Sequence, residues 1–426
     1  LVTDLADGHF RARGDDITEL LADPGHGGRG APRPQHSPAP SRGRDDKNHS
    51  GVIILTDPAD YEPVLASLDK TGEIPAGNRR ELAWKAFQLV SAYDACIADY
   101  FQGLTEAEQP MPDPPERYQI NCRLDYRLRY GENPHQKAGF YRTHPAVWEV
   151  LHGKELSFNN LQDIDSSLRA LRLFERPTVV ITKHCNPCGI GSADALPEAY
   201  AKAFAADTQS PFGGIVAVNR GLDLETAQQI NQVFTEIIIA PDFEEGVLDF
   251  LKKKKNRRLI RFEKDSLEST REPWELKNLF HGYLLQEWDL VGDQPAQWKV
   301  VSKRQPDAGQ MKALQFGWKV VSLLRSNAIA LTGEDRVLGL GSGQTSRIDA
   351  IHLAIWKARK FGHALAGAVC ASDGFFPFVD SIEKLHQNGI KAIIEPGGSK
   401  GDEEVIHACD EYDICLVFTG FRHFRH

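Results

Sequence analysis

The sequence has few features of membrane, secreted or nucleic-acid-binding proteins. A transmembrane helix needs an apolar run of about 18 residues, and no apolar run in this sequence approaches that length. No signal peptide opens the chain. A formal net charge of −9 over 426 residues argues against general binding to nucleic acid or membrane surfaces. The seven cysteines are sparse and lie mostly in apolar runs, which is typical of reduced thiols in a cytosol. We therefore expect a soluble, cytoplasmic protein with room for two or three domains.

Motifs for tightly bound cofactors are also missing. The glycine series at 339–344 fails as a dinucleotide motif, because Gln344 or Ser346 stands where the last glycine would be. The pair Cys185-x-x-Cys188 has no second pair, and its surroundings lack the H-x-E and P-C-x-x-C halves of a zinc deaminase site. We expect no metal site and no thioredoxin-like redox site.

The amino-terminal 46 residues differ from the rest. Pro24–Arg44 is almost wholly Gly, Pro, Arg, His, Ser and Ala, so it cannot build a core and is predicted to be disordered. The chain opens on Leu1 rather than methionine, which suggests a fragment in which residues 1–46 are an altered segment.

Regular structure is predicted from residue 47 onward. A strand is expected at 52–55, and Asp57-Pro58 is an N-cap followed by proline, so a helix should run to about Leu68. A longer helix at 79–101 carries an apolar stripe, which predicts packing in a core or in a dimer. The stripe consists of Leu82, Ala86, Leu89, Tyr93, Ile97 and Tyr100. Residues 109–115 are proline-rich and predict a linker at a domain boundary.

Beyond the linker, alternating patterns predict an α/β fold with two subdomains, 116–300 and 301–426. Helices are expected at 161–174, 197–206, 223–234, 380–387 and 403–411. Strands are expected at 120–124, 178–182, 237–240, 392–394 and 414–419, and 320–324 is also strand-like.

The 178–182 strand delivers Lys183 and His184 side by side, before a turn predicted at Asn186-Pro187. A lysine beside a histidine can divide one reaction between them. The imidazole removes a proton, and the ammonium meets negative charge or protonates a leaving nitrogen. The alternative is a solvated loop without chemistry.

Three glycine turns and three arginines could face an anion. The turns are 212–214, 339–344 and 396–399, whose N–H groups could bind an anion or simply close the turn. Arg129, Arg347 and Arg422 stand at loops or helix starts, where they could grip a phosphate or lie on the surface. The basic run at 252–258 is interpreted as a solvated face.

The segment 372–380 places three phenylalanines around a proline between two carboxylates. It could form an apolar slot for a flat heterocycle, with Asn327 reading the edge of the ring, or it could be core.

Many ordered segments together closely resemble a known family, the AICAR transformylase part of the bifunctional purine enzyme. That enzyme joins phosphoribosylaminoimidazolecarboxamide formyltransferase to IMP cyclohydrolase. The resemblance covers about residues 116–426. The segments are LRYGENPHQ (128–136), KELSFNNLQDIDSSL (154–168), TKHCNPCG (182–189), SPFGGIVAVNR (210–220), IIIAP (237–241), KKKNRRL (253–259), SNAIAL (326–331), GLGSGQTSR (339–347), SDGFFPFVDS (372–381), EPGGS (395–399) and FTGFRHFRH (418–426).

The resemblance implies formyl transfer from 10-formyltetrahydrofolate to the 5-amine of AICAR. His184 matches the base, and Lys183 matches the residue that stabilises the oxyanion or protonates the leaving folate nitrogen. The residues implied for AICAR are Arg129, Tyr130, Gly213, Glu236, Asn327, Arg347, Phe375 and Arg422. Those implied for folate are Ile348, Asp380, Ser399 and Lys400. Asn186, Phe378 and the terminal His426 are further candidates, and Glu236 stands where the family carries Asp.

The resemblance further implies two cytidine-deaminase-like subdomains and a homodimer with shared sites. No tightly bound cofactor is implied, and the need for a monovalent cation is left open. Residues 47–101 resemble the end of the cyclohydrolase domain, in which Lys47 matches a catalytic residue. Because the groups that would position a substrate beside it are not found, we expect no IMP cyclohydrolase activity. An inactive purine-nucleotide or folate-binding remnant and a zinc deaminase are the alternatives.

Overall fold

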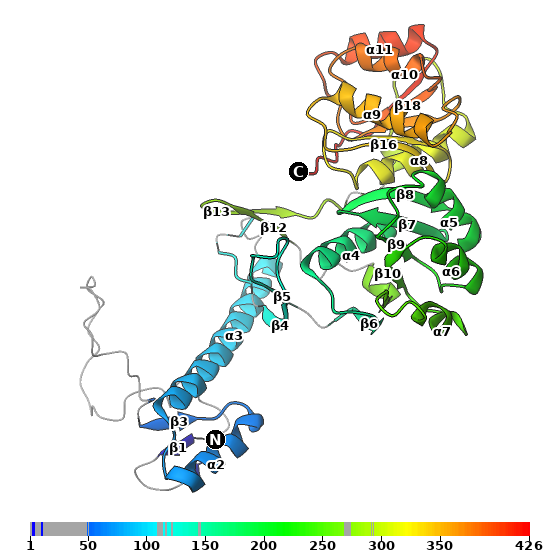
Figure 1. Ribbon diagram of the computed structural model, residues 1–426. Coiled ribbons are helices and arrows are strands. Elements are labelled where there is room, and N and C mark those ends of the chain that lie inside the picture. The colour runs from blue at the N-terminus through cyan, green and yellow to red at the C-terminus, as the bar shows by residue number, and fades with distance from the viewer. Residues whose placement is uncertain are drawn as a thin grey trace. The chain divides into compact units, whose positions relative to one another are not determined.

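The computed structural model divides into two compact units, Leu1–Asn121 and Cys122–His426 (Figure 1). It describes residues 2–4, 10–11, 49, 51–108, 114–115, 117–120, 122–143, 146–267, 274–290, 292 and 294–426. The predicted disordered segment Pro24–Arg44, Lys47 and residues 109–113 of the predicted linker lie outside the described residues.

In the described residues of the first unit there are a small antiparallel sheet and two α-helices. The strands are β1 (Val2–Asp4), β2 (Phe10–Arg11) and β3 (Val52–Ile54), in the order β2-β1-β3. A 3₁₀ turn, η1 (Pro58–Asp60), leads into α2 (Tyr61–Thr71), and α3 spans Ala76–Glu108. The predicted cap is confirmed, since the Asp57 carboxylate accepts the Ala59 N–H at 2.9 Å.

The apolar stripe of α3 is only partly core. Leu82 and Ala86 are buried, and Leu82 packs in a cluster with Ile53 of β3. Farther along the helix, Tyr93 is 66% exposed and Tyr100 is 65% exposed. The dimer alternative therefore stays a prediction for the distal part of the stripe.

The first half of the second unit is a six-stranded mixed sheet with helices on both faces. Its elements are β6 (Trp148–His152), α4 (Phe158–Leu171), β7 (Thr178–Lys183), β8 (Asn186–Ser192), α5 (Leu196–Ala205), β9 (Gly214–Val218), α6 (Leu224–Asn231), β10 (Thr235–Ala240), α7 (Val247–Lys252) and β11 (Arg258–Phe262). The strand order is β6-β11-β10-β9-β7-β8. The three central strands β9, β10 and β11 are parallel, and the other neighbours pair antiparallel.

The second half repeats this topology (Figure 1). Its elements are β14 (Lys299–Val300), α8 (Ala308–Val321), β15 (Ile329–Thr332), β16 (Val337–Gly341), α9 (Arg347–Lys360), β17 (Val369–Ser372), α10 (Asp380–His386), β18 (Ala392–Glu395), α11 (Asp402–Glu411) and β19 (Cys415–Phe418). The order β14-β19-β18-β17-β15-β16 matches the first sheet strand for strand, with the same parallel core. The fold is therefore mixed α/β with an internal repeat, which confirms the predicted class.

Among the described residues, two hairpins and two short 3₁₀ turns make up the rest of the regular structure of this unit. The hairpins are β4 (Arg123–Leu128) with β5 (Ala138–Arg142), and β12 (Trp274–Leu279) with β13 (Gly282–Glu287). The 3₁₀ turns are η2 (Lys264–Leu267) and η3 (Pro295–Gln297). The predicted strand at 120–124 begins only at Arg123, where pairing with Arg142 starts, and Ile120 is exposed.

The strand-like assignment of 320–324 is wrong, because Val320 and Val321 end helix α8. Asp307 and Gln310 close a capping box at the start of this helix, with each side chain bonded to the other residue's backbone N–H. Both valines are fully buried. A short apolar run of this kind fits a buried helix end as well as a strand, so its pattern alone does not decide.

Both faces of each sheet are buried, which explains the continuous apolar strands. In β7, Val180 faces a core shared by the two halves, whereas Val179 and Ile181 face the cluster under α5, α6 and α7. Helices α4 and α8 both border the shared core, and there Phe174 and Phe316 have ring centroids 5.4 Å apart. One core therefore joins the halves.

Glycines in β8 and β16 allow these strands to pack directly on helix backbones. A Cβ on Gly189 would lie 1.9 Å from the Ala203 carbonyl oxygen of α5, and one on Gly341 would lie 1.9 Å from the Ala350 carbonyl oxygen of α9. The prediction that 339–344 is wholly a glycine turn is wrong, because Gly339 and Gly341 belong to β16 and their role is this close contact.

We predict that Gly341→Ala destabilises the protein strongly. The added methyl group overlaps backbone atoms of α9, so strand and helix must separate, at a cost of about 2 kcal/mol or more. Gly333→Ala in the same hairpin is the control, since its Cβ would meet nothing closer than 3.9 Å. Denaturant unfolding measures both variants, and equal stabilities would contradict the packing account.

Candidate functional site

Lys183 ends β7, and His184 and Cys185 form the turn into β8. The φ angles of the two turn residues are 52° and 60°, and Lys183 pairs with Asn186 across the turn. This is the two-residue hairpin connection with both central residues left-handed. The predicted Asn-Pro turn is wrong, because Asn186 and Pro187 already belong to β8.

Helix α4 holds this turn in place. Residues other than glycine pay about 1 kcal/mol or more for a left-handed conformation, so the surroundings must hold it. The Asp163 carboxylate accepts the Cys185 N–H at 2.6 Å, and the Ser166 hydroxyl donates to the Cys185 carbonyl at 3.0 Å. The Asn186 amide donates to the His184 carbonyl at 2.8 Å. The turn is therefore rigid, and sequence reasoning did not assign Asp163 or Ser166 to it.

The two candidate catalytic side chains lie beside each other at this turn. Lys183 Nζ donates to the Phe212 carbonyl at 2.8 Å. His184 is exposed, and within the described residues its imidazole makes no hydrogen bond. An imidazole held on a rigid turn and open to solvent can take a proton from a bound substrate.

One implied AICAR residue of the first half, Gly213, lies beside Lys183. Gly213 follows Phe212, has φ 73°, and donates its N–H to the Phe234 carbonyl at 2.7 Å. The exposed rings of Phe212 and Phe234 lie 5.3 Å apart. These two phenylalanines were not assigned from the sequence, although Phe212 lies in the motif at 210–220.

Glu236, at the start of β10, forms an ion pair with Arg258. Its carboxylate accepts Arg258 Nη1 at 2.8 Å and the Asn160 amide at 3.4 Å. Arg257 and Arg258 are 3% and 8% exposed, so the predicted solvated face at 252–258 is wrong for these two arginines. Both bind backbone carbonyls, and guanidinium groups tolerate burial when paired in this way.

Cys185 and Cys188 are poor candidates for a thiolate. Burial, with the nearby Asp163 carboxylate, raises the pKa of the Cys185 thiol to about 11. Burial raises the pKa of the Cys188 thiol to about 12. Both thiols are therefore protonated at neutral pH.

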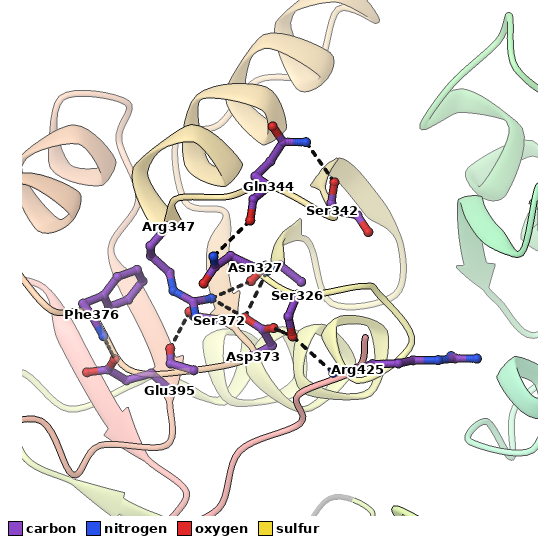
Figure 2. Close-up of polar contacts among 12 residues, drawn as sticks. Ser326, Asn327, Ser342, Gln344, Arg347, Ser372, Asp373, Phe376, Glu395 and Arg425 are labelled. Carbon is purple, nitrogen blue, oxygen red and sulfur yellow. Dashed lines mark hydrogen bonds and ion pairs between the residues drawn. The ribbon is translucent and has the colours of Figure 1, made fainter. Parts of the chain in front are cut away.

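A second group of implied residues lies at the carboxyl ends of β17 and β18 in the second half (Figure 2). Asn327, just before β15, donates its side-chain amide to the Gln344 carbonyl at 3.0 Å. Arg347, the first residue of α9, bonds the buried Asp373 and the Ala328 carbonyl. Asp373 also accepts the Ser326 hydroxyl at 2.5 Å.

The three arginines predicted to grip a phosphate have different surroundings. The Arg347 guanidinium is buried and neutralised by Asp373, so it is not an open anion site. Arg422 lies over the Phe424 ring at 4.3 Å, and a Cβ on Gly374 would touch both Phe424 and Arg347. Arg129 bonds the Tyr130 hydroxyl at 3.1 Å, near the hairpin β4–β5. The structure therefore places Arg422 near Arg347, and no described contact joins Arg129 to them.

The predicted aromatic slot at 372–380 divides into two roles. Phe376 is fully buried in the core under α9, α10 and α11. Phe375 is 37% exposed and Phe378 is 69% exposed, so these two rings are available for contact. The core alternative is therefore confirmed for Phe376, and the slot stays a prediction for Phe375 and Phe378.

The N–H groups of the glycine turn at 396–399 bind a carboxylate of the protein itself. The Asp402 carboxylate accepts the N–H groups of Gly398 at 2.7 Å and Ser399 at 2.9 Å. In the other two turns the N–H groups of Gly213 and Gly343 bond backbone carbonyls. Since these donors are occupied, the anion interpretation is wrong for them, and they close turns.

The candidate folate residues lie around the same edge of the second half. Ile348 is in the first turn of α9, Asp380 begins α10, and Ser399 and Lys400 precede α11. Asp380 and Lys400 are exposed. A polar rim thus borders the group around Arg347 and Phe375.

The carboxyl-terminal segment is built into this edge. Ser326 N–H donates to the Arg425 carbonyl at 2.9 Å, and the buried His423 bonds Asp289 at 2.6 Å. The terminal His426 is exposed and its carbonyl accepts Lys277 Nζ at 3.2 Å. Arg425 and His423 were not assigned from the sequence, since nothing in their spacing distinguishes them from their neighbours.

Contacts between the edge strands of the two sheets bring the Lys183–His184 turn close to the second group of implied residues. Gly191 of β8 bridges Arg336 beside β16, and Lys202 of α5 bonds Asp335 at 2.6 Å. As a result the Ser342 hydroxyl lies 3.3 Å from the Asn186 side-chain oxygen. The Lys183–His184 turn therefore lies next to the loop that holds Asn327.

Two features that would indicate other functions are missing from the described residues. These residues contain no group of three or more His, Cys, Asp or Glu side chains placed to hold a metal ion. None of their helices combines the length and the apolar character that crossing a membrane requires.

Comparison with known proteins identifies related chains. A model of the AICARFT/IMPCHase bienzyme family matches residues 46–357. The bifunctional purine biosynthesis protein PurH of Streptococcus mutans is 45% identical over 388 residues, which is 89% of this chain and 74% of the relative. The protein of the same name from Chlorobium phaeobacteroides is 46% identical over 393 residues, with the same two shares.

We predict that Asp163→Ala loosens the turn at His184. The Cys185 N–H loses its acceptor in a half-buried position, which costs about 1–3 kcal/mol. Asp165→Ala on the same helix is the control, since this exposed carboxylate forms a surface ion pair with Arg169 and should contribute less than about 0.5 kcal/mol. Hydrogen exchange at the Cys185 amide should accelerate only in the first variant, and unchanged exchange would refute the role of Asp163.

Proposed function

The chain belongs to the AICARFT/IMPCHase bienzyme family, and on that premise we propose that it transfers a formyl group from 10-formyltetrahydrofolate to the 5-amine of AICAR. The products are FAICAR and tetrahydrofolate. The printed name of the relatives, bifunctional purine biosynthesis protein, supports a role in purine biosynthesis. 10-Formyltetrahydrofolate is consumed as a cosubstrate and is not a bound cofactor.

The observation that carries this proposal is the rigid turn with Lys183 and His184 beside the Asn327 loop. The amine of AICAR is a weak nucleophile, because its lone pair is drawn into the imidazole carboxamide. A base must remove its proton as the nitrogen attacks the formyl carbon. His184 is exposed on a held turn, so it suits this role, and the transferred proton is stored on the imidazole.

Lys183 acts on the formyl oxygen and on the folate nitrogen that leaves. The formyl oxygen gains negative charge when nitrogen attacks, and an ammonium nearby stabilises it. The same ammonium can then protonate the departing folate nitrogen. Its hydrogen bond to the Phe212 carbonyl fixes its direction before substrate arrives.

We assign the nucleotide to the edge of the second half and to the residues around Gly213. Asn327 and Phe375 would contact the imidazole carboxamide, with the Arg347–Asp373 pair beneath them. Arg129, Tyr130, Glu236 and Arg422 complete the AICAR assignment, and Ile348, Asp380, Ser399 and Lys400 the folate assignment. Each repeat half is proposed to be cytidine-deaminase-like, and the enzyme a cytoplasmic homodimer with shared sites. The exposed distal stripe of α3 favours a partner chain.

The alternative is a chain that binds AICAR or folate without transferring the formyl group. A homodimer that releases tetrahydrofolate when mixed with both substrates supports the enzyme. A monomer that only binds AICAR supports the alternative, and size-exclusion chromatography with a binding assay separates the two.

We predict that His184→Ala lowers the rate of formyl transfer by roughly a hundredfold or more while AICAR still binds, because a base is removed and the pocket is kept. His352→Ala is the control, since this exposed histidine lies on the outer helix α9. Tetrahydrofolate release measures the rate. Turnover at the level of the control would sink the assignment of His184 as the base.

The absence of IMP cyclohydrolase activity stays a prediction. Ring closure needs the amide and formyl groups of FAICAR to be positioned together, and Lys47 alone cannot position them. We therefore expect no IMP when the purified 426-residue chain is given FAICAR. IMP formation at a rate close to that of a bifunctional relative would show that the prediction is wrong.

A further inference from the structure

The internal repeat distinguishes residues that the fold needs from residues that it does not. Asn219 and Asp373 follow equivalent strands, β9 and β17. Asn219 accepts the N–H of Thr178, the first residue of β7, at 2.8 Å, and Asp373 accepts the N–H of Ala328, just before β15, at 3.0 Å. An acceptor at this position therefore belongs to the fold. The registers of β10 and β18 make Ala240 equivalent to Glu395, and a proline follows each. The fold accepts alanine at that position, so the carboxyl group of Glu395 has another purpose.

Glu395 is enclosed at the edge that we assign to AICAR. Its side chain is fully buried, and one carboxyl oxygen accepts the Phe376 N–H at 2.6 Å. The other oxygen is buried without a hydrogen-bond partner in the described part of the chain. Figure 2 shows Glu395 below the Arg347–Asp373 pair and beside Phe376. It thus joins the end of β18 to the segment that carries Phe375.

The charges around Glu395 decide its ionisation. Arg347 and Asp373 already cancel each other, so an ionised Glu395 would leave one uncompensated buried negative charge. Burial raises the pKa of the Glu395 carboxyl to about 8, against the opposing pull of the Phe376 N–H. Asp402 raises this pKa further and Arg347 lowers it, while the thiols of Cys370 and Cys409 stay neutral. The proton is therefore retained at pH 7 and lost above about pH 8.

We propose that Glu395, as a neutral carboxylic acid, is a positioning residue that holds the Phe375–Phe376 segment in the conformation that receives AICAR. The proposal rests on the function proposed above. Phe376 is anchored in the core and its N–H bonds Glu395, so the partly exposed ring of Phe375 is fixed at the edge. Ionisation introduces a buried charge next to that bond, and the segment shifts or takes in water to solvate it.

The direction of the pH effect follows from these positions. The binding-competent form carries the proton, so AICAR affinity is constant below about pH 8 and falls above it. With loss of binding on ionisation, the dissociation constant of the wild type should rise roughly tenfold from pH 7 to pH 9. The free energy of unfolding also falls with rising pH, but over a lower range. The folded chain keeps a proton that the unfolded chain releases, so this loss begins above the ordinary glutamate pKa and is complete by about pH 8.

Calorimetric titration of AICAR at pH 7 and pH 9 tests the proposal on the wild type, Glu395→Gln, Glu395→Ala and Glu411→Gln. The amide keeps the shape and the neutrality of the acid. Glu395→Gln should therefore bind AICAR within about twofold of wild type at pH 7, and its dissociation constant should not rise at pH 9. Glu395→Ala should weaken binding at both values, because the Phe376 N–H loses its acceptor. Glu411 is the exposed last residue of α11, so Glu411→Gln should keep the wild-type rise.

Infrared difference spectra of wild type against Glu395→Gln read the proton directly. A protonated carboxyl band at pH 7 that is absent from the variant supports the proposal, and its absence from the wild type overturns it. An equal rise of the AICAR dissociation constant from pH 7 to pH 9 in Glu395→Gln and in wild type also overturns the proposal. Wild-type protein that binds AICAR but transfers no formyl group would refute the proposed function alone, since the pH effect is read from binding.

Discussion

The candidate site depends on the junction between the edge strands β8 and β16. The N–H of Ser192 donates to the Asp335 carbonyl at 2.7 Å, and Gly191 bridges Arg336. The Lys202–Asp335 ion pair covers this contact, with both side chains largely withdrawn from solvent. Glycines let β8 and β16 lie directly on α5 and α9, so each edge strand is packed closely on its own helix. The junction then places the Lys183–His184 turn beside Ser342, which lies in the loop that holds Asn327.

Under the proposed function, a repeated topology allows the two halves to divide the chemistry. The first half uses its hairpin turn to present a lysine and a histidine, and α4 holds that turn through Asp163 and Ser166. The corresponding hairpin of the second half, around Gly333–Arg336, is used for the junction instead. The second half in turn carries ionisable residues at the carboxyl ends of β17 and β18, where the first half has Asn219 and Ala240. One architecture thus supplies two different edges to one site.

Periodicity and capping predicted several helices and strands of the second unit, because buried β-branched runs and Asp or Ser caps act locally. The same local rules failed where partners are distant. The turn is at His184–Cys185, and not at Asn186-Pro187, because pairing of β7 with β8 and the bonds from α4 outweigh turn propensity. Arg347 was predicted beside an anion because its buried partner Asp373 lies far along the chain. Glu395 was not assigned, since its burial depends on strand order.

The central claim is that one AICAR molecule spans the Lys183–His184 turn and the edge of the second half. A crystal structure of the chain with AICAR bound tests this directly. The account predicts the 5-amine within hydrogen-bond distance of the His184 imidazole and the imidazole carboxamide in contact with Asn327 and Phe375. AICAR bound away from the turn, or held by the second half with its amine pointing to solvent, would contradict it.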